Sequence, residues 1–348
     1  MLVTLCRRVL SVERKLLRFY SVNLEHVVSN HSREGGLQQG EDYVVDQSFD
    51  VTRLRRDEDK SLRIAILGLP NAGKSTLVNA LAGRQICAMS GKAHTTRSKT
   101  NVIYSEDDTQ LIFIDTPGLV TNRDFNKFKL EPTFKSDIET SLERADVVGV
   151  VQDASHPFRR HKIDERVIEA LKRTKPGVTS ILILNKVDRV KPKKELLKLV
   201  DILTGEQNWP NFSDIFMISA LKNDGVDDLR AYLLDSAKNR DWDFSPNQIT
   251  DEPTEKIVER TVKAKFMDAL PDELPYILKI KTEHLGVLPD DSMSAIVNIN
   301  CPTDRISKLV MGPKGARVKH VALAAEQELS NAFRTAVRLK IAINFKDK

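Results

Sequence analysis

A glycine-rich segment from Gly68 to Thr76 restricts the fold of this chain more than any other feature. It reads Gly-Leu-Pro-Asn-Ala-Gly-Lys-Ser-Thr and matches every fixed position of the phosphate-binding pattern G-x-x-x-x-G-K-S. An apolar run of β type, Arg63 to Leu67, precedes the segment, and residues 75–81 follow it with helical spacing. The pattern therefore predicts a strand, a tight loop and a helix in succession, rather than a chance glycine-rich turn.

The chemistry of this loop depends on groups that converge on a phosphate. Two glycines let successive backbone N–H groups point inward, and the N-terminus of the following helix adds partial positive charge. Lys74 would reach the β- and γ-phosphates, and the Ser75 hydroxyl would ligate Mg²⁺. The candidate binding residues are Gly68, Pro70, Asn71, Ala72, Gly73, Lys74, Ser75 and Thr76.

Two later segments indicate which base the nucleotide carries. Asn185-Lys-Val-Asp188 follows an apolar run at the C-terminal end of an expected strand, where ligands of open α/β sheets bind. The Asp188 carboxylate can accept two hydrogen bonds from guanine, whereas adenine has no amine there and would leave acceptors unpaired. Asn185 would contact the guanine edge, the Lys186 stem would cover the base, and a backbone N–H of Ser219–Ala220 would reach the guanine oxygen. GTP is therefore the predicted nucleotide.

Two further segments are expected to respond to the γ-phosphate. An apolar run ends in Asp115-Thr-Pro-Gly118, where Asp115 would hold Mg²⁺ through water and the Gly118 amide would sense the γ-phosphate. The polar stretch Lys92 to Arg97 contains Thr96, which, in preference to Thr95, would ligate Mg²⁺ only when the γ-phosphate is present. These segments predict a nucleotide-dependent switch.

Hydrolysis needs a positioned water and charge neutralisation, and the residues present predict slow intrinsic turnover. Leu119 follows Gly118 where many GTPases carry a water-orienting glutamine, and an apolar side chain cannot orient water. Asn71 either helps to hold K⁺ against the phosphates or only shapes the turn, and both interpretations stay open. The candidate catalytic residues are Lys74, Asn71, Thr96 and Gly118, and the candidate Mg²⁺ ligands are Ser75, Thr96 and Asp115.

The length and composition of the chain indicate more than one domain. The 348 residues exceed one ordinary domain, and a hydrophobic content of 41% suffices for real cores. Strand and helix patterns alternate from Arg63 to about Ser236, which predicts an α/β domain with a mostly parallel sheet over residues 61–240. The three cysteines lack metal-binding spacing, which argues against zinc and against a secreted disulfide framework. No apolar run approaches ~18 residues, so no transmembrane span is predicted.

The first 20 residues have a composition of their own, with five lysines or arginines against one acid, Glu13. This amphipathic, Arg-rich and acid-poor pattern predicts a mitochondrial transit peptide over 1–20; a basic surface helix is the alternative. Residues 21–60 lack apolar periodicity and are predicted to be a flexible N-terminal segment. The expected location is therefore the mitochondrial matrix.

Beyond a linker rich in aspartate and proline at 241–255, residues 256–348 predict a second, α+β domain. Helical spacing over 255–270 precedes two strand patterns, at 276–282 and 294–300, which flank a polar loop at 286–292. Two more helices are expected at 303–310 and 317–333, and a last strand at 337–344.

The segment Gly312-Pro-Lys-Gly315 stands between those two helices. A G-x-x-G segment between two helices, beside a small sheet, is the K-homology arrangement, which binds single-stranded nucleic acid. The alternative is a tight helix–helix turn with no ligand. From Lys256 to Lys348 there are sixteen lysines and arginines against eleven acids, a modest surplus that favours a local grip. The candidate RNA-binding residues are Lys308, Gly312, Pro313, Lys314, Gly315, Arg317 and Lys319.

Together these motifs resemble the Era family of ribosome-assembly GTPases from about Arg63 onward, and the transit-like start resembles its mitochondrial members. The segments that carry the resemblance are 68–76, 92–97, 115–119, 185–188, 273–276 and the Gly-Pro-Lys-Gly-Ala run from Gly312. The resemblance implies GTP/GDP and Mg²⁺ as cofactors and a type II K-homology domain. It also implies that the partner is the 3′ region of small-subunit ribosomal RNA, bound during assembly of the mitochondrial small ribosomal subunit. Peripheral association with the inner membrane is left open.

Two other functions fit the same sequence. In one, GTP hydrolysis is the output and the C-terminal domain is a protein adaptor. In the other, the protein is a static RNA-binding chaperone whose nucleotide is structural. The interior of the G-x-x-G is Pro-Lys, which departs from the bacterial pattern, and Pro313 removes one backbone donor from the grip.

Overall fold

The structure is a computed structural model that describes residues 58–90, 92, 99–119, 133–271 and 274–345. The expected transit peptide and nearly all of the expected flexible segment lie outside the described residues, as does Thr96. In the described part of the chain, no helix is both long and apolar enough to cross a bilayer.

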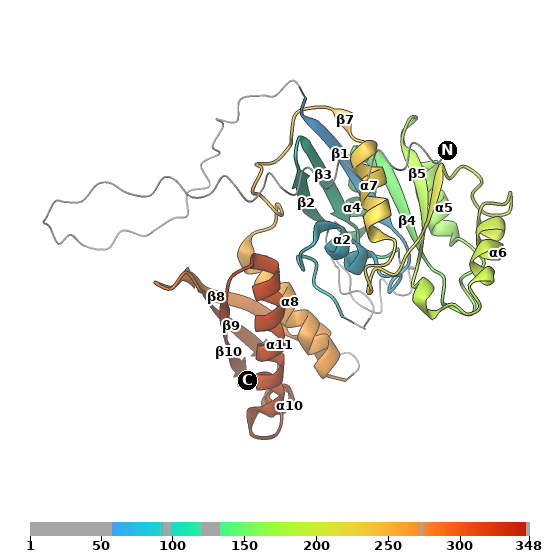
Figure 1. Ribbon diagram of the computed structural model, residues 1–348. Coiled ribbons are helices and arrows are strands. Elements are labelled where there is room, and N and C mark those ends of the chain that lie inside the picture. The colour runs from blue at the N-terminus through green and yellow to red at the C-terminus, as the bar shows by residue number, and fades with distance from the viewer. Residues whose placement is uncertain (1–57, 91, 93–98, 120–132, 272–273, 346–348) are drawn as a thin grey trace, which may run out of the picture. The chain divides into compact units, whose positions relative to one another are not determined.

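A twisted α/β sheet forms the first part of the structure (Figure 1). Its strands follow the order β2-β3-β1-β4-β5-β6, and β7 pairs with β1. Only β2 and β7 run antiparallel to their neighbours, so the mostly parallel sheet that was predicted is confirmed. The strands are β1 (Lys60–Leu67), β2 (Thr100–Glu106), β3 (Thr109–Asp115), β4 (Val147–Asp153), β5 (Thr179–Asn185), β6 (Asp214–Met217) and β7 (Lys238–Asn239).

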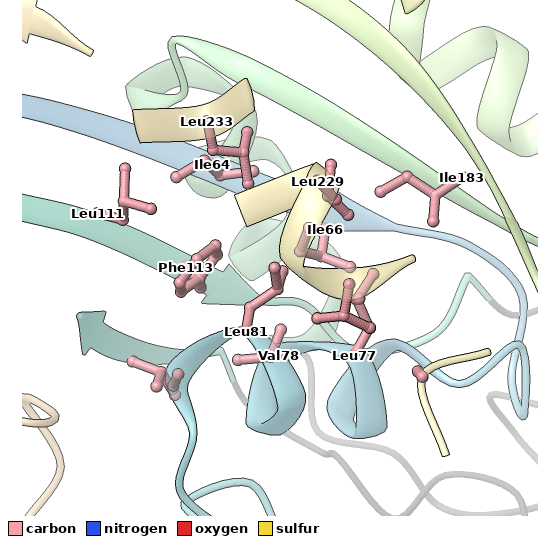
Figure 2. Close-up of a cluster of buried hydrophobic side chains, with 14 of the residues drawn as sticks. Ile64, Ile66, Leu77, Val78, Leu81, Leu111, Phe113, Ile183, Leu229 and Leu233 are labelled. Carbon is pink, nitrogen blue, oxygen red and sulfur yellow. The ribbon is translucent and has the colours of Figure 1, made fainter. Parts of the chain in front are cut away.

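Helices cover both faces of this sheet because its central strands are apolar on both sides. In β1, Ile64 and Ile66 point into one core with α2 and α7, whereas Ala65 and Leu67 point into the other with α4, α5 and α6. Figure 2 shows the first core, where Phe113 of β3 lies among the side chains of these elements. The helices are α2 (Lys74–Ala82), α4 (Thr133–Arg144), α5 (Glu165–Lys172), α6 (Lys194–Leu203) and α7 (Val226–Asp235), with a short 3₁₀ turn η1 (Val187–Arg189) after β5.

The segment that follows β7 is held along β2 and β3 by hydrogen bonds, although its sequence shows no periodicity. The Trp242 indole donates to the Asp108 carbonyl at 3.0 Å, and Gln110 exchanges two hydrogen bonds with the backbone of Phe244. Further on, the Ile103 N–H donates to the Ile249 carbonyl at 2.9 Å. Side-chain and backbone pairing of this kind leaves no pattern of hydrophobicity for sequence analysis to detect.

The C-terminal elements form a small α+β unit in the order helix, strand, strand, helix, helix, strand, as expected for a type II K-homology domain. Strand β9 is central, antiparallel to β8 and parallel to β10. The elements are α8 (Thr254–Ala269), α9 (Leu274–Ile277), β8 (Lys279–Val287), β9 (Met293–Cys301), α10 (Asp304–Met311), η2 (Pro313–Gly315), α11 (Ala316–Phe333) and β10 (Val337–Phe345).

One predicted strand is displaced along the sequence. The strand expected at 276–282 begins at Lys279, because Leu274–Ile277 forms a helical turn, and it continues to Val287, within the expected loop. A register shift between Thr282 and His284 lets β8 keep pairing with β9 up to Val287 and Met293. Such a shift breaks the two-residue alternation on which the strand prediction depended.

Candidate functional site

The phosphate-binding loop depends on glycines at positions where any side chain would collide. Gly68 has φ +152° and Gly73 has φ +97°, both in the region that favours glycine. A Cβ atom would lie 2.5 Å from the Val151 carbonyl oxygen at Gly68, and 2.3 Å from Asn185 Nδ2 at Gly73. The loop between them passes directly into α2, whose Leu77 N–H donates to the Gly73 carbonyl at 2.9 Å. The loop is thus packed against the ends of β4 and β5, as a phosphate cradle requires.

Lys74 lies folded over this loop. Its Nζ donates to the carbonyls of Gly68 at 3.3 Å and Leu69 at 3.2 Å. Burial lowers the pKa of Lys74 to about 8, although the nearby Asp115 carboxylate opposes the shift. The charge is therefore retained at neutral pH and placed where the phosphates of a bound nucleotide would lie.

The residues that the sequence assigned to Mg²⁺ meet at the end of β3. Ser75 Oγ donates to Asp115 Oδ2 at 2.7 Å, so a hydroxyl and a carboxylate oxygen face the same space. Hard oxygen donors of this kind suit Mg²⁺, and both residues fit the predicted ligand set. The third predicted ligand, Thr96, lies outside the described residues.

Gly118 lies directly against the phosphate-binding loop. A Cβ atom on it would approach Pro70 N to 2.9 Å, and the next N–H, of Leu119, donates to the Gly68 carbonyl at 3.3 Å. The Leu119 side chain is buried in the core beneath α4 and α5. It therefore cannot direct a water at the γ-phosphate, as its apolar character had indicated.

Asn185 joins three segments of the site. Its Nδ2 donates to the Ala72 carbonyl at 2.9 Å, and its Oδ1 accepts from the N–H groups of Lys186 at 2.8 Å and Ala220 at 3.0 Å. The sequence placed Asn185 at the guanine edge and an N–H of Ser219–Ala220 on the guanine oxygen. The structure shows that Asn185 and Ala220 also hold the loops of the site in place, and the two guanine contacts stay predictions.

The residues that were predicted to read the base line a pocket that they share with the phosphate-binding loop. Its lining includes Gly73, Thr76, Lys186, Asp188 and Ser219. The Ser219 hydroxyl makes the largest contribution to lowering the pKa of Asp188, so this carboxylate is ionised at neutral pH. An ionised carboxylate at this place can accept both guanine donors.

The structure brings the predicted cofactor-binding residues together in the described part of the chain. One pocket lies at the phosphate-binding loop, and a second, which shares lining residues with it, lies at Asp188. The predicted residues that line these two pockets, or that make the hydrogen bonds around them, are Gly68, Pro70, Asn71, Ala72, Gly73, Lys74, Ser75, Thr76, Asp115, Gly118, Asn185, Lys186, Asp188, Ser219 and Ala220.

Asp153 belongs to this site but was missed by the sequence analysis. Lys186 Nζ donates to Asp153 Oδ2 and to the Asn71 carbonyl, both at 2.6 Å, so the lysine stem is fixed at its far end. Burial alone would raise the pKa of Asp153, but hydrogen bonds from Lys186 and Ser155 outweigh it and lower the pKa. Its position at the end of β4 beside Asn185, the end of β5, was the available signal.

The Asp153→Asn variant is expected to bind GTP and GDP with equal losses of about tenfold, because it weakens a charge-assisted hydrogen bond at the base-covering lysine. Titration calorimetry with both nucleotides measures the loss. Asp201→Asn, an exposed position on α6, serves as the matched control. A loss confined to GTP would contradict this role, because Asp153 is placed at the base-covering lysine and not at the phosphates.

The G-x-x-G turn has the backbone geometry of a tight approach to a ligand. Gly312 has φ 71° and ψ 176°, Lys314 has φ 50°, and Gly315 has φ 76°. The Lys314 and Lys319 side chains are exposed. The Lys308 side chain, also exposed, pairs with Asp304 at 2.6 Å.

The structure adds two details around this turn. The Arg317 guanidinium donates to the Leu309 carbonyl at the end of α10, so it supports the turn. Val310 is fully buried in the core, whereas Leu309 is 43% exposed beside the turn. Burial differs between these neighbours because helical spacing turns them to different sides of α10.

This fold and this site define a P-loop GTPase joined to a small α+β unit. Residues 63–186 match the family model described as "50S ribosome-binding GTPase". The chain is 30% identical over 358 residues to "GTPase Era, mitochondrial" of Danio rerio, with 86% of this chain and 80% of that protein covered. It is 33% identical over 274 residues to "GTPase Era" of Brucella melitensis, with 79% and 84% covered. The chain belongs to the Era family of GTPases, and it hydrolyses GTP to GDP and phosphate.

Two solved structures are similar over both parts of the chain. One is a crystal structure of Era in complex with MgGDPNP and nucleotides 1506–1542 of 16S ribosomal RNA, 27% identical with a TM-score of 0.68. The other is an Aquifex aeolicus Era variant bound to GDP·AlF₄⁻, 27% identical with a TM-score of 0.69. Each match covers 83% of this chain and 95% of the other chain. The Era fold therefore extends over both the GTPase sheet and the C-terminal α+β unit.

Proposed function

We propose that the protein is a mitochondrial Era-type GTPase that binds the 3′ region of small-subunit ribosomal RNA and assists assembly of the mitochondrial small ribosomal subunit. The proposal depends on one observation: a single chain contains both a guanine-nucleotide site and a G-x-x-G turn. Its fold is similar to that of an Era protein crystallised with nucleotides 1506–1542 of 16S ribosomal RNA. The GTP state would then control the grip on RNA.

The proposed domains are a transit peptide at 1–20, a flexible segment at 21–60, a GTPase domain at 61–240, a linker at 241–255 and an RNA-binding domain at 256–348. The Arg-rich start and the mitochondrial relatives from Danio rerio and Salmo salar support import into the matrix. A fluorescent protein fused behind residues 1–40 tests this location. A diffuse cytosolic signal would contradict it.

In the proposed mechanism, Lys74 and the loop amides bind the β- and γ-phosphates. Ser75, Thr96 and Asp115 would hold Mg²⁺, directly or through water, and the ion would neutralise charge on the phosphates. Asp188 selects guanine while Lys186, fixed by Asp153, covers the base. Turnover without an activator is slow because Leu119 is buried and positions no water.

Crosslinking of the full chain to ribosomal RNA in GTP and in GDP tests the proposal. A footprint that depends on the nucleotide supports the GTP-controlled grip. Absence of RNA would support a protein-adaptor domain instead. A footprint that is equal in both nucleotides would support a static chaperone.

Potassium is expected to raise the GTPase rate about tenfold over sodium if Asn71 helps to place a cation. Asn71 has φ 62° and an exposed side chain that lines the phosphate pocket, which is where a cation beside the phosphates would have to lie. Asn71→Ala should remove the difference between potassium and sodium. Asn223→Ala is the matched control, because Asn223 has a similar φ of 57° in an exposed turn and should keep it. Equal rates in the two salts for the wild-type chain would contradict the cation role.

A further inference from the structure

Two short segments of the GTPase domain concentrate positive charge outside the nucleotide site. Residues 158–162 read Phe-Arg-Arg-His-Lys, and residues 191–198 read Lys-Pro-Lys-Lys-Glu-Leu-Leu-Lys. Together they hold seven lysines and arginines against one acid, a formal charge of +6, which exceeds the +5 of the whole chain. Six of these seven cations are exposed, and the seventh, Arg160, is partly exposed. Lys162 pairs with Glu165 and Lys198 with Glu195 in exposed ion pairs, which a phosphate can replace.

The fold brings the two segments together. They follow β4 and β5, which are parallel neighbours with Asp153 opposite Asn185 at their C-terminal ends. Just beyond this pair, the Ala154 N–H donates to the Asn185 carbonyl at 3.0 Å. Lys198 and, more weakly, Arg160 lower the pKa of Glu195, so a cation of the first segment lies near the second. The two segments therefore belong to one surface, here called the basic surface and defined as residues 158–162 and 191–198.

An aromatic ring stands on this surface. Phe158 is 89% exposed, more than any other large hydrophobic side chain in the described part of the chain. Its backbone is nevertheless firmly held, because His156 Nδ1 accepts from the N–H groups of Phe158 at 3.3 Å and Arg159 at 3.2 Å. The side-chain amide of Gln152, on β4, donates to the backbone carbonyls of Arg159 at 2.7 Å and Lys162 at 3.3 Å. The loop backbone is therefore held in place by hydrogen bonds, while the Phe158 ring is exposed to solvent.

We propose that the basic surface binds single-stranded RNA, with Phe158 stacked on an unpaired base and the surrounding cations on the phosphates. An exposed ring among cations is the usual combination for single-stranded nucleic acid, since every base has a face to stack on and every nucleotide a charge. This inference rests on the proposed RNA-binding function and adds a contact on the GTPase domain. RNA would then be bound at two places, the basic surface of the GTPase domain and the G-x-x-G turn of the C-terminal unit.

Two other ligands fit the surface less well. An anionic membrane would match the charge, but one phenylalanine and the exposed Leu197 offer little apolar area to insert between lipids. An acidic protein segment would match the charge and leave the exposed ring without a flat partner. RNA alone uses both the charge and the ring.

The test measures binding of the full chain to a fluorescent, 4-thiouridine-containing oligouridine of about 20 nucleotides, a length that spans several stacked bases. Phe158→Ala is expected to weaken binding about five- to a hundredfold, and Phe158→Tyr to keep it within about twofold. The double variant Arg159→Glu with Lys194→Glu should lower the slope of log affinity against log salt by about 1.4, because two phosphates would no longer be neutralised by the protein. Lys172→Glu with Lys175→Glu, at the last residue of α5 and just beyond it, is the matched charge control.

GTP affinity should remain at the wild-type value in all four variants, because none of the changed residues lines the nucleotide site. Crosslinking should recover the peptide that contains Phe158. Equal RNA affinity of Phe158→Ala and wild type would overturn the inference, while the proposed function would stand on the ribosomal RNA footprint. A wild-type chain that does not bind the oligouridine would also overturn it, because stacking tolerates any sequence.

Discussion

Lys74→Ala is expected to abolish nucleotide binding, with an affinity loss of about 10²- to 10⁴-fold for both GTP and GDP. Charge-assisted hydrogen bonds contribute about 1.5–3 kcal/mol each, and this lysine is placed to make two of them with phosphates. Its Nζ already lies over the loop, on the carbonyls of Gly68 and Leu69. Titration calorimetry measures the loss, and Lys172→Ala, an exposed lysine on α5, is the control.

Without bound nucleotide, the Lys74→Ala variant should melt at the wild-type temperature or above it. Burial lowers the pKa of Lys74, which means that the charged form costs stability in the folded chain. Removal of this charge therefore cannot unfold the protein through a lost ion pair. A Lys74→Ala chain that binds GTP within about tenfold of wild type would contradict the assignment of the phosphate site.

The pH dependence of nucleotide binding is an independent test of the role of Lys74. Lys74 has a pKa of about 8 in the free protein, so it is protonated below that pH and neutral above it. Phosphates favour the charged form and raise the pKa, so binding above pH 8 requires uptake of a proton. Affinity should therefore stay constant below about pH 7 and fall toward tenfold per pH unit above about pH 8. Lys74→Ala should lack this fall.

The sequence predicted the parts of the site that depend on local chain geometry. A phosphate loop needs glycines at fixed spacing, and the collisions that a Cβ would cause at Gly68 and Gly73 show why the spacing is strict. Buried parallel strands are apolar on both faces, so β1 and β5 were visible as short apolar runs. The order and type of the C-terminal elements followed from helical and strand periods in the same way.

Contacts between distant residues could not be predicted in this way. Asp153 reads as an ordinary acid at a strand end, and only the pairing of β4 with β5 places it beside Lys186. The motif of Asn185 does not reveal its hydrogen bonds to Ala72 and Ala220, because these partners lie in two other loops. The extent of β8 was missed because a register shift interrupts its alternation. Each of these features depends on pairing across the fold.

Gly312→Asp is expected to weaken RNA binding about 10- to 150-fold and to leave GTP affinity unchanged. Its φ of 71° strains any other residue, and a Cβ atom there would lie 2.7 Å from Arg317 Cβ, which forces the first turn of α11 to move. The new carboxylate would also repel a phosphate at the turn, where one charge-assisted contact contributes about 1.5–3 kcal/mol. Electrophoretic mobility shift with ribosomal RNA measures the affinity.

Because this substitution can also unfold the C-terminal unit, Lys314→Glu tests the contact without the collision. Lys314 is exposed, so its reversal of charge should weaken RNA binding while the melting temperature stays near that of wild type. Gly177→Asp is the matched glycine control, since Gly177 has φ +85° with nothing within 4 Å of an added Cβ and lies outside the turn. If Lys314→Glu bound RNA as wild type does, the turn would not be the phosphate contact. If Gly312→Asp lost GTP binding as Lys74→Ala does, nucleotide and RNA would not be bound by separate parts of the chain.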